Sequence, residues 1–471
     1  MYKLSEVKEN KKLSTMMKHY ASVKERYPDC IVFYRLGDFY EMFFEDAVEA
    51  SKVLDLTLTG RDCGLPERAP MCGVPFHAAN VYIAKLVAEG YKVAVCEQLS
   101  EPDGKNPVDR DVIRVITSGT VTDNDQIDEK TNNFICSVFG SDDKYGIAYS
   151  DITTGDFVVA EVKGDDALGD ILTRIDPAEI IVNQKNHEKL CNLPVFTHGV
   201  IVRPAAYKEY AFTESAATEN ICKQFKVHSF AALELDKRPL AVRAAGALLE
   251  YFSETQMRAL SIISSVKIER DGERMILDAN CLRNLEIVRN MRDGKTRGSL
   301  LFVLDHTCTA MGARLMHSIL VAPLKNKAKI EYRLDGVEEL FKNMPITAAI
   351  RETLSDMRDI ERIAGRLSND VISPKDMEVL RQSLELIPEI KFRLSGLSTK
   401  ALTDVNAHMK DLSDVTDLLR KAIIENAPAL AREGGFIREG FDEELDKLKN
   451  IHNNGKSVIA DIEARERERT G

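Results

Sequence analysis

The hydrophobic pattern of this chain changes its period once, and that change limits the folds that the chain can adopt. Up to about residue 262, short apolar runs typical of strands alternate with stretches at helical spacing. From about residue 275 the spacing is almost purely helical. The 471 residues are enough for about three domains. The sequence therefore predicts a multidomain fold, in which two α/β domains precede an all-α part.

The hydrophobic pattern of residues 1–120 predicts the first α/β domain. Helices are expected at 13–27, 45–54 and 80–89, and strands at 31–34, 39–43, 56–59, 92–98 and 112–117. The segment 60–75 is rich in glycine and proline, and we expect it to be a loop. An acidic linker, 120–129, follows.

The second α/β domain is expected to extend to about residue 262. Strand-like runs at 133–139, 145–151 and 156–162 are separated by short turns, which predicts an antiparallel meander. A further strand is expected at 179–182. In the helical part, Ser373 is the expected N-cap of a helix whose first position is Pro374.

Composition limits the class of protein. The net charge is −11, so no global basic field indicates nucleic acid. No apolar run is long enough to span a bilayer, and the N-terminus lacks an apolar signal region. Nine cysteines without a C-x-x-C pair indicate reduced thiols. These features predict a soluble, cytoplasmic protein without a membrane partner.

A nucleotide site is suggested by two Gly-Lys-Ser/Thr tripeptides, at 294–296 and 455–457, but their context does not support it. A phosphate-binding loop needs another glycine five residues earlier, and those positions hold Arg289 and Asn450. We therefore expect no cofactor and no catalytic residue in this chain.

Metal binding is the weaker interpretation of two residue groups. Asp151, Asp156 and Asp176 lie on or near expected strands and could hold Mg²⁺ for phosphoryl transfer. Strand-end and turn positions are the stronger explanation for these three residues. A second group, formed by Cys63, Cys72 and His77, matches no zinc spacing. We predict no metal site.

The segment 34–44 is unusual because it holds five aromatic residues interleaved with charged ones. In an extended strand, Phe39 and Glu41 point to one face, and Tyr40 and Met42 to the other. A face that carries both a large ring and a carboxylate is unsuited to a core. It suits a ligand with stacking surfaces and hydrogen-bonding edges, such as a nucleic-acid base.

The same segment resembles a signature of the MutS family of bacterial DNA mismatch sensors, Gly-Asp-Phe-Tyr-Glu. Further stretches similar to that family occur in order along the chain, at 37–43, 70–78, 93–98, 149–155, 304–315, 322–324 and 463–471. The resemblance covers essentially the whole chain.

The resemblance implies a domain order. Residues 1–120 would form the mismatch-binding domain, 121–262 a connector of ribonuclease-H-like topology, 263–458 a helical core and lever, and 459–471 the start of a clamp. The rest of the clamp and the family's ATPase domain are expected to be missing, because the final charged helix has no stop signal before residue 470. ATP and Mg²⁺ would then belong to the full-length protein only.

The resemblance also implies site residues and partners. Phe39 would wedge between base steps and Glu41 would bond the displaced base. Arg61 and Met71 are possible contacts to the DNA backbone or groove, although charge pairing within the protein surface is a nearly equal alternative for this region. The partners would be double-stranded DNA with mismatches or small loops, a MutL-type protein and, in the full-length protein, a second copy, acting at the bacterial nucleoid. Two alternatives remain: a structure-selective, Mg²⁺-dependent nuclease, and an interaction scaffold that docks the MutL-type partner.

Overall fold

The computed structural model describes the chain except residues 1–3, 5–9, 11, 101–107, 122–127, 198–201, 257–259, 270–271, 370, 454 and 471, and it describes no side chain in 455–461. Most of the predicted linker, 120–129, therefore lies outside the described residues. The chain divides into two compact units. Unit 1 comprises 1–327 with 364–369, and unit 2 comprises 328–363 with 370–471.

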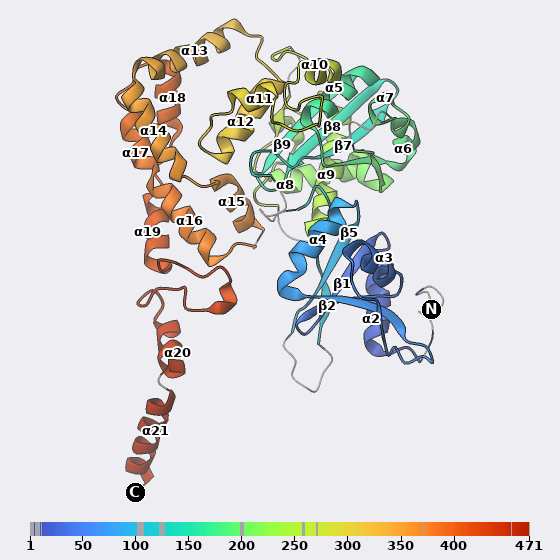
Figure 1. Ribbon diagram of the computed structural model, residues 1–471, viewed down its shortest axis with the longest axis vertical. Coiled ribbons are helices and arrows are strands. Elements are labelled where there is room, and N and C mark those ends of the chain that lie inside the picture. The colour runs from blue at the N-terminus through green and yellow to red at the C-terminus, as the bar shows by residue number, and fades with distance from the viewer. Residues whose placement is uncertain are drawn as a thin grey trace. The chain divides into compact units, whose positions relative to one another are not determined.

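Unit 1 contains two six-stranded sheets. The first has the strand order β3-β4-β2-β1-β5-β6. Its one parallel pair of neighbouring strands is β1 and β5, and the other neighbours are antiparallel. Figure 1 shows this sheet with its helices. Its strands are β1 (Cys30–Leu36), β2 (Phe39–Phe43), β3 (Thr59–Arg61), β4 (Ala69–Pro75), β5 (Lys92–Gln98) and β6 (Arg110–Ile116).

The expected loop 60–75 is wrong in its second half, because residues 69–75 form β4 between β2 and β3. The expected strand 56–59 is also displaced, since β3 begins at Thr59. Pro70 and Pro75 caused the first error: both read as strand breakers. They lie near the two ends of β4, where a missing N–H costs the ladder least.

Helices cover both faces of this sheet. On one face, α2 (Thr15–Arg26) contributes Met17 and Tyr20 to a cluster with Val32, Tyr34 and Phe43. On the other face, α3 (Phe44–Leu54) and α4 (Ala79–Ala88) pack over Phe33, Tyr40 and Met42 of β1 and β2. Strand β2 therefore distributes its side chains between two separate cores.

The second sheet has the order β11-β10-β7-β8-β9-β12. Strands β7 (Ile135–Ser141), β8 (Lys144–Asp151) and β9 (Asp156–Lys163) form the predicted antiparallel meander, which is confirmed. Strand β10 (Glu179–Asn183) pairs parallel with β7, and β11 (Ala205–Tyr207) pairs parallel with β10. Strand β12 (Lys267–Ile268) joins β9, so this sheet draws one strand from beyond residue 262.

Long helices complete the second sheet's core. Helix α9 (Pro239–Gln256) buries Ala241, Ala244, Ala245 and Leu248 against it, beside α8 (Glu214–Phe225). Shorter helices in this part of unit 1 are α5 (Asp165–Ile175), α6 (Gln184–Cys191), α7 (Pro194–Thr197), α10 (Ala279–Asn284), α11 (Leu300–Leu304) and α12 (Ala310–Val321).

Unit 2 is rich in helices. They are α13 (Lys327–Lys342), α14 (Met344–Asp356), α15 (Ile360–Ser368), α16 (Pro374–Glu385), α17 (Ile387–Leu394), α18 (Lys400–His408), α19 (Ser413–Ala422), α20 (Glu443–Asn453) and α21 (Gly455–Thr470), of which α13 and α15 extend into unit 1. The predicted N-cap Ser373 is confirmed, and it forms a capping box with Asp376. No helix of the described residues is long and apolar enough to cross a membrane.

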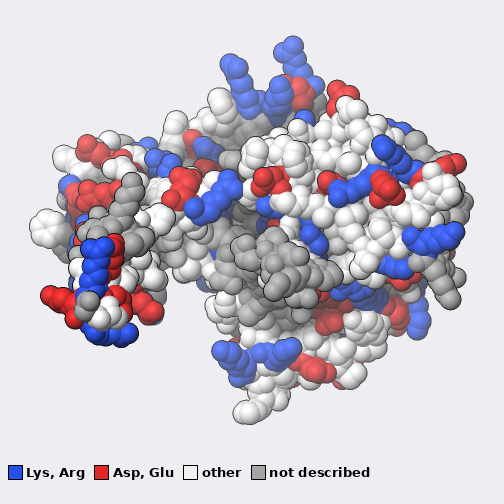
Figure 2. Space-filling model, turned by 90° about the horizontal axis from the view of Figure 1, so that it is seen from below, with Lys and Arg blue, Asp and Glu red and all other residues white. Residues whose placement is uncertain are grey.

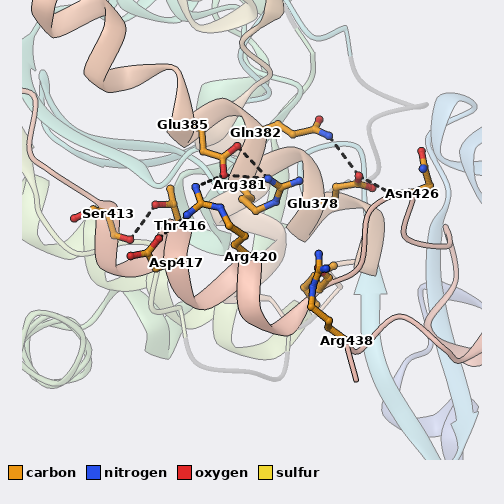
Figure 3. Close-up of polar contacts among 11 residues, drawn as sticks. Glu378, Arg381, Gln382, Glu385, Ser413, Thr416, Asp417, Arg420, Asn426 and Arg438 are labelled. Atoms are coloured by element: carbon orange, nitrogen blue, oxygen red, sulfur yellow. Dashed lines mark hydrogen bonds and ion pairs between the residues drawn. The ribbon is translucent and has the colours of Figure 1, made fainter. Parts of the chain in front are cut away.

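Ion pairs join α16 to α19 within unit 2. Figure 3 shows Glu385 between two arginines: its carboxylate accepts from Arg381 Nη1 at 3.0 Å and from Arg420 Nη2 at 2.8 Å. Nearby, Glu378 accepts the backbone N–H groups of Asn426 and Ala427 at 2.9 and 3.0 Å. Glu385 therefore joins α16 to α19, and Glu378 fixes the loop after α19 against α16.

Close backbone packing in the second sheet gives a test of the fold. An alanine Cβ at Gly146 of β8 would lie 2.0 Å from the carbonyl carbon of Leu240 in α9. We expect Gly146→Ala to lower the free energy of unfolding by about 1–3 kcal/mol. The atoms that the new Cβ would meet belong to the helix backbone, which cannot move aside as the end of a flexible side chain can. The matched control is Gly169→Ala in α5, where the new Cβ meets only Val195 at 3.5 Å. There, alanine should raise stability by about 0.5–1 kcal/mol. Denaturant unfolding of both variants measures the difference, and equal effects would contradict the packing.

Candidate nucleic-acid interface

A tight hairpin between β1 and β2 presents the first candidate residue. Its two-residue turn consists of Gly37 and Asp38, and Gly37 adopts a φ of +59°, which glycine tolerates best. The Gly37 N–H donates to Gln98 Oε1 at 3.0 Å, and the Asp38 carbonyl accepts the Phe76 N–H at 2.9 Å. The turn is therefore tied to the ends of β4 and β5, and it fixes the position of Phe39.

Side chains on β2 alternate as the sequence predicts. Tyr40 and Met42 are 6% and 0% exposed and pack beneath α3 and α4, whereas Phe39 is 47% exposed. The Glu41 side chain lies on the same face as Phe39 and is 15% exposed. A ring and a carboxylate thus share one face of the strand, next to the hairpin turn.

The structure brings Glu41 and Arg61 into direct contact. The Arg61 guanidinium donates through Nη1 to Glu41 Oε2 in a short ion pair, although the two residues lie on strands separated by β4. Directly opposite Glu41 on β4 is Gly73, where a Cβ would lie 3.4 Å from Glu41 Cγ. The sequence left charge pairing within the surface open for Arg61, and the structure shows that Glu41 is the partner.

Met71, the fourth candidate, lies on β4 opposite Phe43. It is partly buried against the α2-side cluster, and its carbonyl accepts the Thr59 hydroxyl at 3.0 Å. Its register places it on the same face of the sheet as Gly73 and Glu41. The four predicted residues therefore come from β2, β3 and β4 and share one sheet face.

Arg35, for which the sequence predicted no role, supports the hairpin on the sheet face opposite to Phe39. Its guanidinium carbon lies 3.7 Å from the centroid of the Phe76 ring and 5.4 Å from that of Tyr40, and Nη1 lies 3.7 Å from Glu97 Oε1. The Tyr40 hydroxyl donates to Glu97 Oε2 at 2.5 Å. Burial, together with this bond, raises the pKa of Tyr40 well above its ordinary value. Tyr40, Phe76 and Glu97 lie in family-like stretches and Arg35 lies in the aromatic segment 34–44, but only the folded structure reveals their contacts.

The carboxylates considered for Mg²⁺ are engaged with donors of the chain. Asp151 is fully buried, and it accepts the backbone N–H groups of Asn133 and Thr153 at 2.9 Å each. Asp156 pairs with Lys267 at 2.5 Å, and Asp176 pairs with Arg289 at 2.9 Å. Among the residues that the structure describes, no group of three or more His, Cys, Asp or Glu side chains could hold a metal ion.

The two cysteines considered for zinc belong to different clusters. Cys63 lies in the cluster under α2, whereas Cys72 lies in the cluster under α3 and α4. Burial raises the pKa of the Cys72 thiol to about 12, so it stays protonated at neutral pH. These two thiols pack as apolar groups.

The tripeptide 294–296 lies in an exposed turn, in which the Asn290 N–H donates to the Lys295 carbonyl at 2.9 Å. The next helix, α11, begins only at Leu300, so this turn does not lead directly into a helix N-terminus as a phosphate-binding loop does. In the second tripeptide, 455–457, the side chains lie outside the described residues.

Figure 2 shows how charged side chains are distributed over one face of the molecule. On the face drawn in Figure 2, basic and acidic side chains of the described residues lie interspersed. Contacts to phosphates would then be local ones, since the whole chain carries a net charge of −11.

Comparison with known proteins identifies three domain models of one family. MutS domain I matches residues 14–125, MutS domain II matches 133–264, and MutS domain III matches 280–470. Proteins named DNA mismatch repair protein MutS are similar to 98% of this chain. Those of Ruminiclostridium cellulolyticum and Caldanaerobacter subterraneus are 42% identical, and that of Lachnoclostridium phytofermentans is 40% identical. The aligned part is 53%, 53% and 49% of those proteins, so the chain spans about half their length.

The exposure of Phe39 gives a stability test. We expect Phe39→Ala to change the melting temperature by only a few degrees, because an exposed ring loses little burial on truncation. The matched control is Met42→Ala on the same strand. It should cost about 2–5 kcal/mol, because Met42 is fully buried. Thermal melting followed by circular dichroism compares the two, and a similar drop in both variants would place Phe39 in the core.

Proposed function

We propose that this chain recognises mismatched DNA in post-replicative repair, because it belongs to the MutS family and carries that family's domains I, II and III in order. The observation that carries the proposal is the exposed ring of Phe39, held beside the hairpin turn next to the largely buried carboxylate of Glu41. Double-stranded DNA with mismatches or small loops is the proposed substrate.

Mispaired bases share weak stacking rather than a common pattern of donors and acceptors. Wedging a ring between base steps costs a few kcal/mol on paired DNA and less at a defect, where the step kinks readily. Phe39 would enter the minor groove as this wedge. The contacts that tie Gly37 and Asp38 to neighbouring strands would hold the ring while the DNA bends around it.

Glu41 would supply the base contact. Its carboxylate accepts a hydrogen bond from a displaced base, whereas on intact duplex it meets phosphates with no base edge to offset the repulsion. The penalty on intact duplex adds to the discrimination that the wedge provides. Arg61 and Met71 line the same sheet face and remain the proposed groove or backbone contacts.

The remaining domains receive family roles in this proposal. The order β9-β8-β7-β10-β11, with three antiparallel strands followed by two parallel ones, supports a ribonuclease-H-like connector. The helix-rich part would be the core and lever, and residues from 459 would begin a clamp. For the full-length protein we propose further properties of the family. These are binding of ATP and Mg²⁺, a homodimer, a MutL-type partner and a cytoplasmic, nucleoid-associated location.

The two alternatives receive no support from the comparisons. Relatives named DNA mismatch repair protein MutS favour recognition over cleavage. Asp151, Asp156 and Asp176 have structural partners in the fold, and no observation favours a role as scaffold alone.

Binding to matched and mismatched duplexes tests the proposal. The purified chain should bind a duplex with one mismatch more tightly than the matched duplex, with or without Mg²⁺ and without cutting either. Phe39→Ala should bring the ratio of the two affinities close to one. Gel shift measures the ratio. Equal affinities for the unaltered chain would contradict mismatch recognition, and Mg²⁺-dependent cleavage would favour the nuclease.

Substitutions of Glu41 test the role of its charge. Glu41→Ala should bind matched DNA more tightly, by about 1 kcal/mol, because repulsion is removed and the Arg61 guanidinium is released toward phosphates. The mismatched duplex should gain less, so the ratio falls. Glu41→Gln should keep more of the ratio, because an amide oxygen still accepts a hydrogen bond. Equal weakening on both duplexes in both variants would make Glu41 a purely structural residue.

A further inference from the structure

We propose that Arg61 is a positioning residue for mismatch discrimination: it holds one oxygen of the Glu41 carboxylate so that the other oxygen faces the displaced base. The inference rests on the proposed mismatch recognition. It assigns Arg61 a role through Glu41, in place of an independent contact to the DNA backbone.

The ion pair engages one of the two carboxylate oxygens of Glu41. Arg61 Nη1 donates to Glu41 Oε2, and among the described residues no other side chain or backbone group donates to this carboxylate. A carboxylate accepts at both oxygens. Oε1 of Glu41 therefore keeps its capacity for a base while Oε2 is engaged.

The ion pair with Arg61 is the polar contact that the structure shows at the end of the Glu41 side chain. The neighbour opposite Glu41 on β4 is Gly73, which has no side chain to pack against it. A glutamate has three rotatable side-chain bonds, and immobilising such a side chain on binding lowers affinity. Arg61 removes this cost in advance, before DNA arrives.

The location of Arg61 supports positioning over an independent phosphate contact. The residue lies on β3, at the edge of the sheet, and its side chain reaches past β4 toward Glu41. A guanidinium already paired with a carboxylate is partly neutralised, and so attracts phosphates less than a free one. Its effect on DNA should therefore depend on the presence of Glu41.

The two roles differ in the ratio of mismatched to matched affinity. A phosphate contact acts equally on both duplexes, so its loss lowers both affinities by the same factor. Repulsion between an unpaired Glu41 and the phosphates acts on both duplexes, and it differs between them only through the base contact that offsets it on the mismatched duplex. The cost of ordering Glu41 onto a displaced base falls on the mismatched duplex alone.

The experiment measures this ratio by fluorescence titration of the full chain with matched and singly mismatched duplexes. Arg61→Met keeps the apolar stem and should lower the ratio about 2- to 10-fold. Arg61→Lys keeps a cation and should restore part of it. In a Glu41→Ala background, Arg61→Met should leave the ratio of that background unchanged. The matched control, Arg26→Met, removes the ion pair with Asp111 elsewhere in the same domain and should leave the ratio as it is.

Three outcomes would overturn the inference. In the first, Arg61→Met lowers both affinities equally and keeps the ratio, which makes Arg61 a backbone contact. In the second, it lowers the ratio by the same factor with and without Glu41. In the third, Arg26→Met lowers the ratio as much as Arg61→Met, which indicates a general effect on the domain. Failure of the proposed function is distinguishable, because the unaltered chain would then show a ratio of one.

Discussion

The burial of Tyr40 and Met42 beneath α3 and α4 is the constraint on which the candidate interface depends. Successive residues of a strand point to opposite faces, so fixing these two side chains also fixes the direction of their neighbours. Phe39 and Glu41 must then point to the other face. That face is covered at Phe43 by the cluster under α2, but Phe39 remains 47% exposed beside the hairpin turn. Core packing thus holds the exposed ring in place.

The second feature of the interface is the rigidity of its support. The Arg35 guanidinium lies against the rings of Phe76 and Tyr40, and Glu97 accepts the Tyr40 hydroxyl. Such charged and aromatic contacts join three strands directly behind the turn. The proposed wedge, Phe39, needs this support, because a ring that moved freely could not hold two base pairs apart while the DNA bends.

Local sequence signals predicted the regular elements better than the irregular ones. The meander of the second domain and the N-cap at Ser373 follow from short-range patterns, and both were correct. Strand β4 was missed, because prolines such as Pro70 and Pro75 usually indicate a loop. Only the structure shows that they lie near the ends of a strand. The boundary near residue 262 stays a prediction, although β12 at 267–268 joins the second sheet.

The sequence by itself determined which residues of β2 share a face, because alternation is a property of the strand alone. The family resemblance, also carried by the sequence, identified the candidate wedge and base contact. Only the tertiary structure decided that Glu41 pairs with Arg61. These residues are 20 positions apart in the chain, and their strands are separated by β4, so their contact depends on strand order and register. Strand order results from the packing of the whole domain, and no local pattern around either residue encodes it.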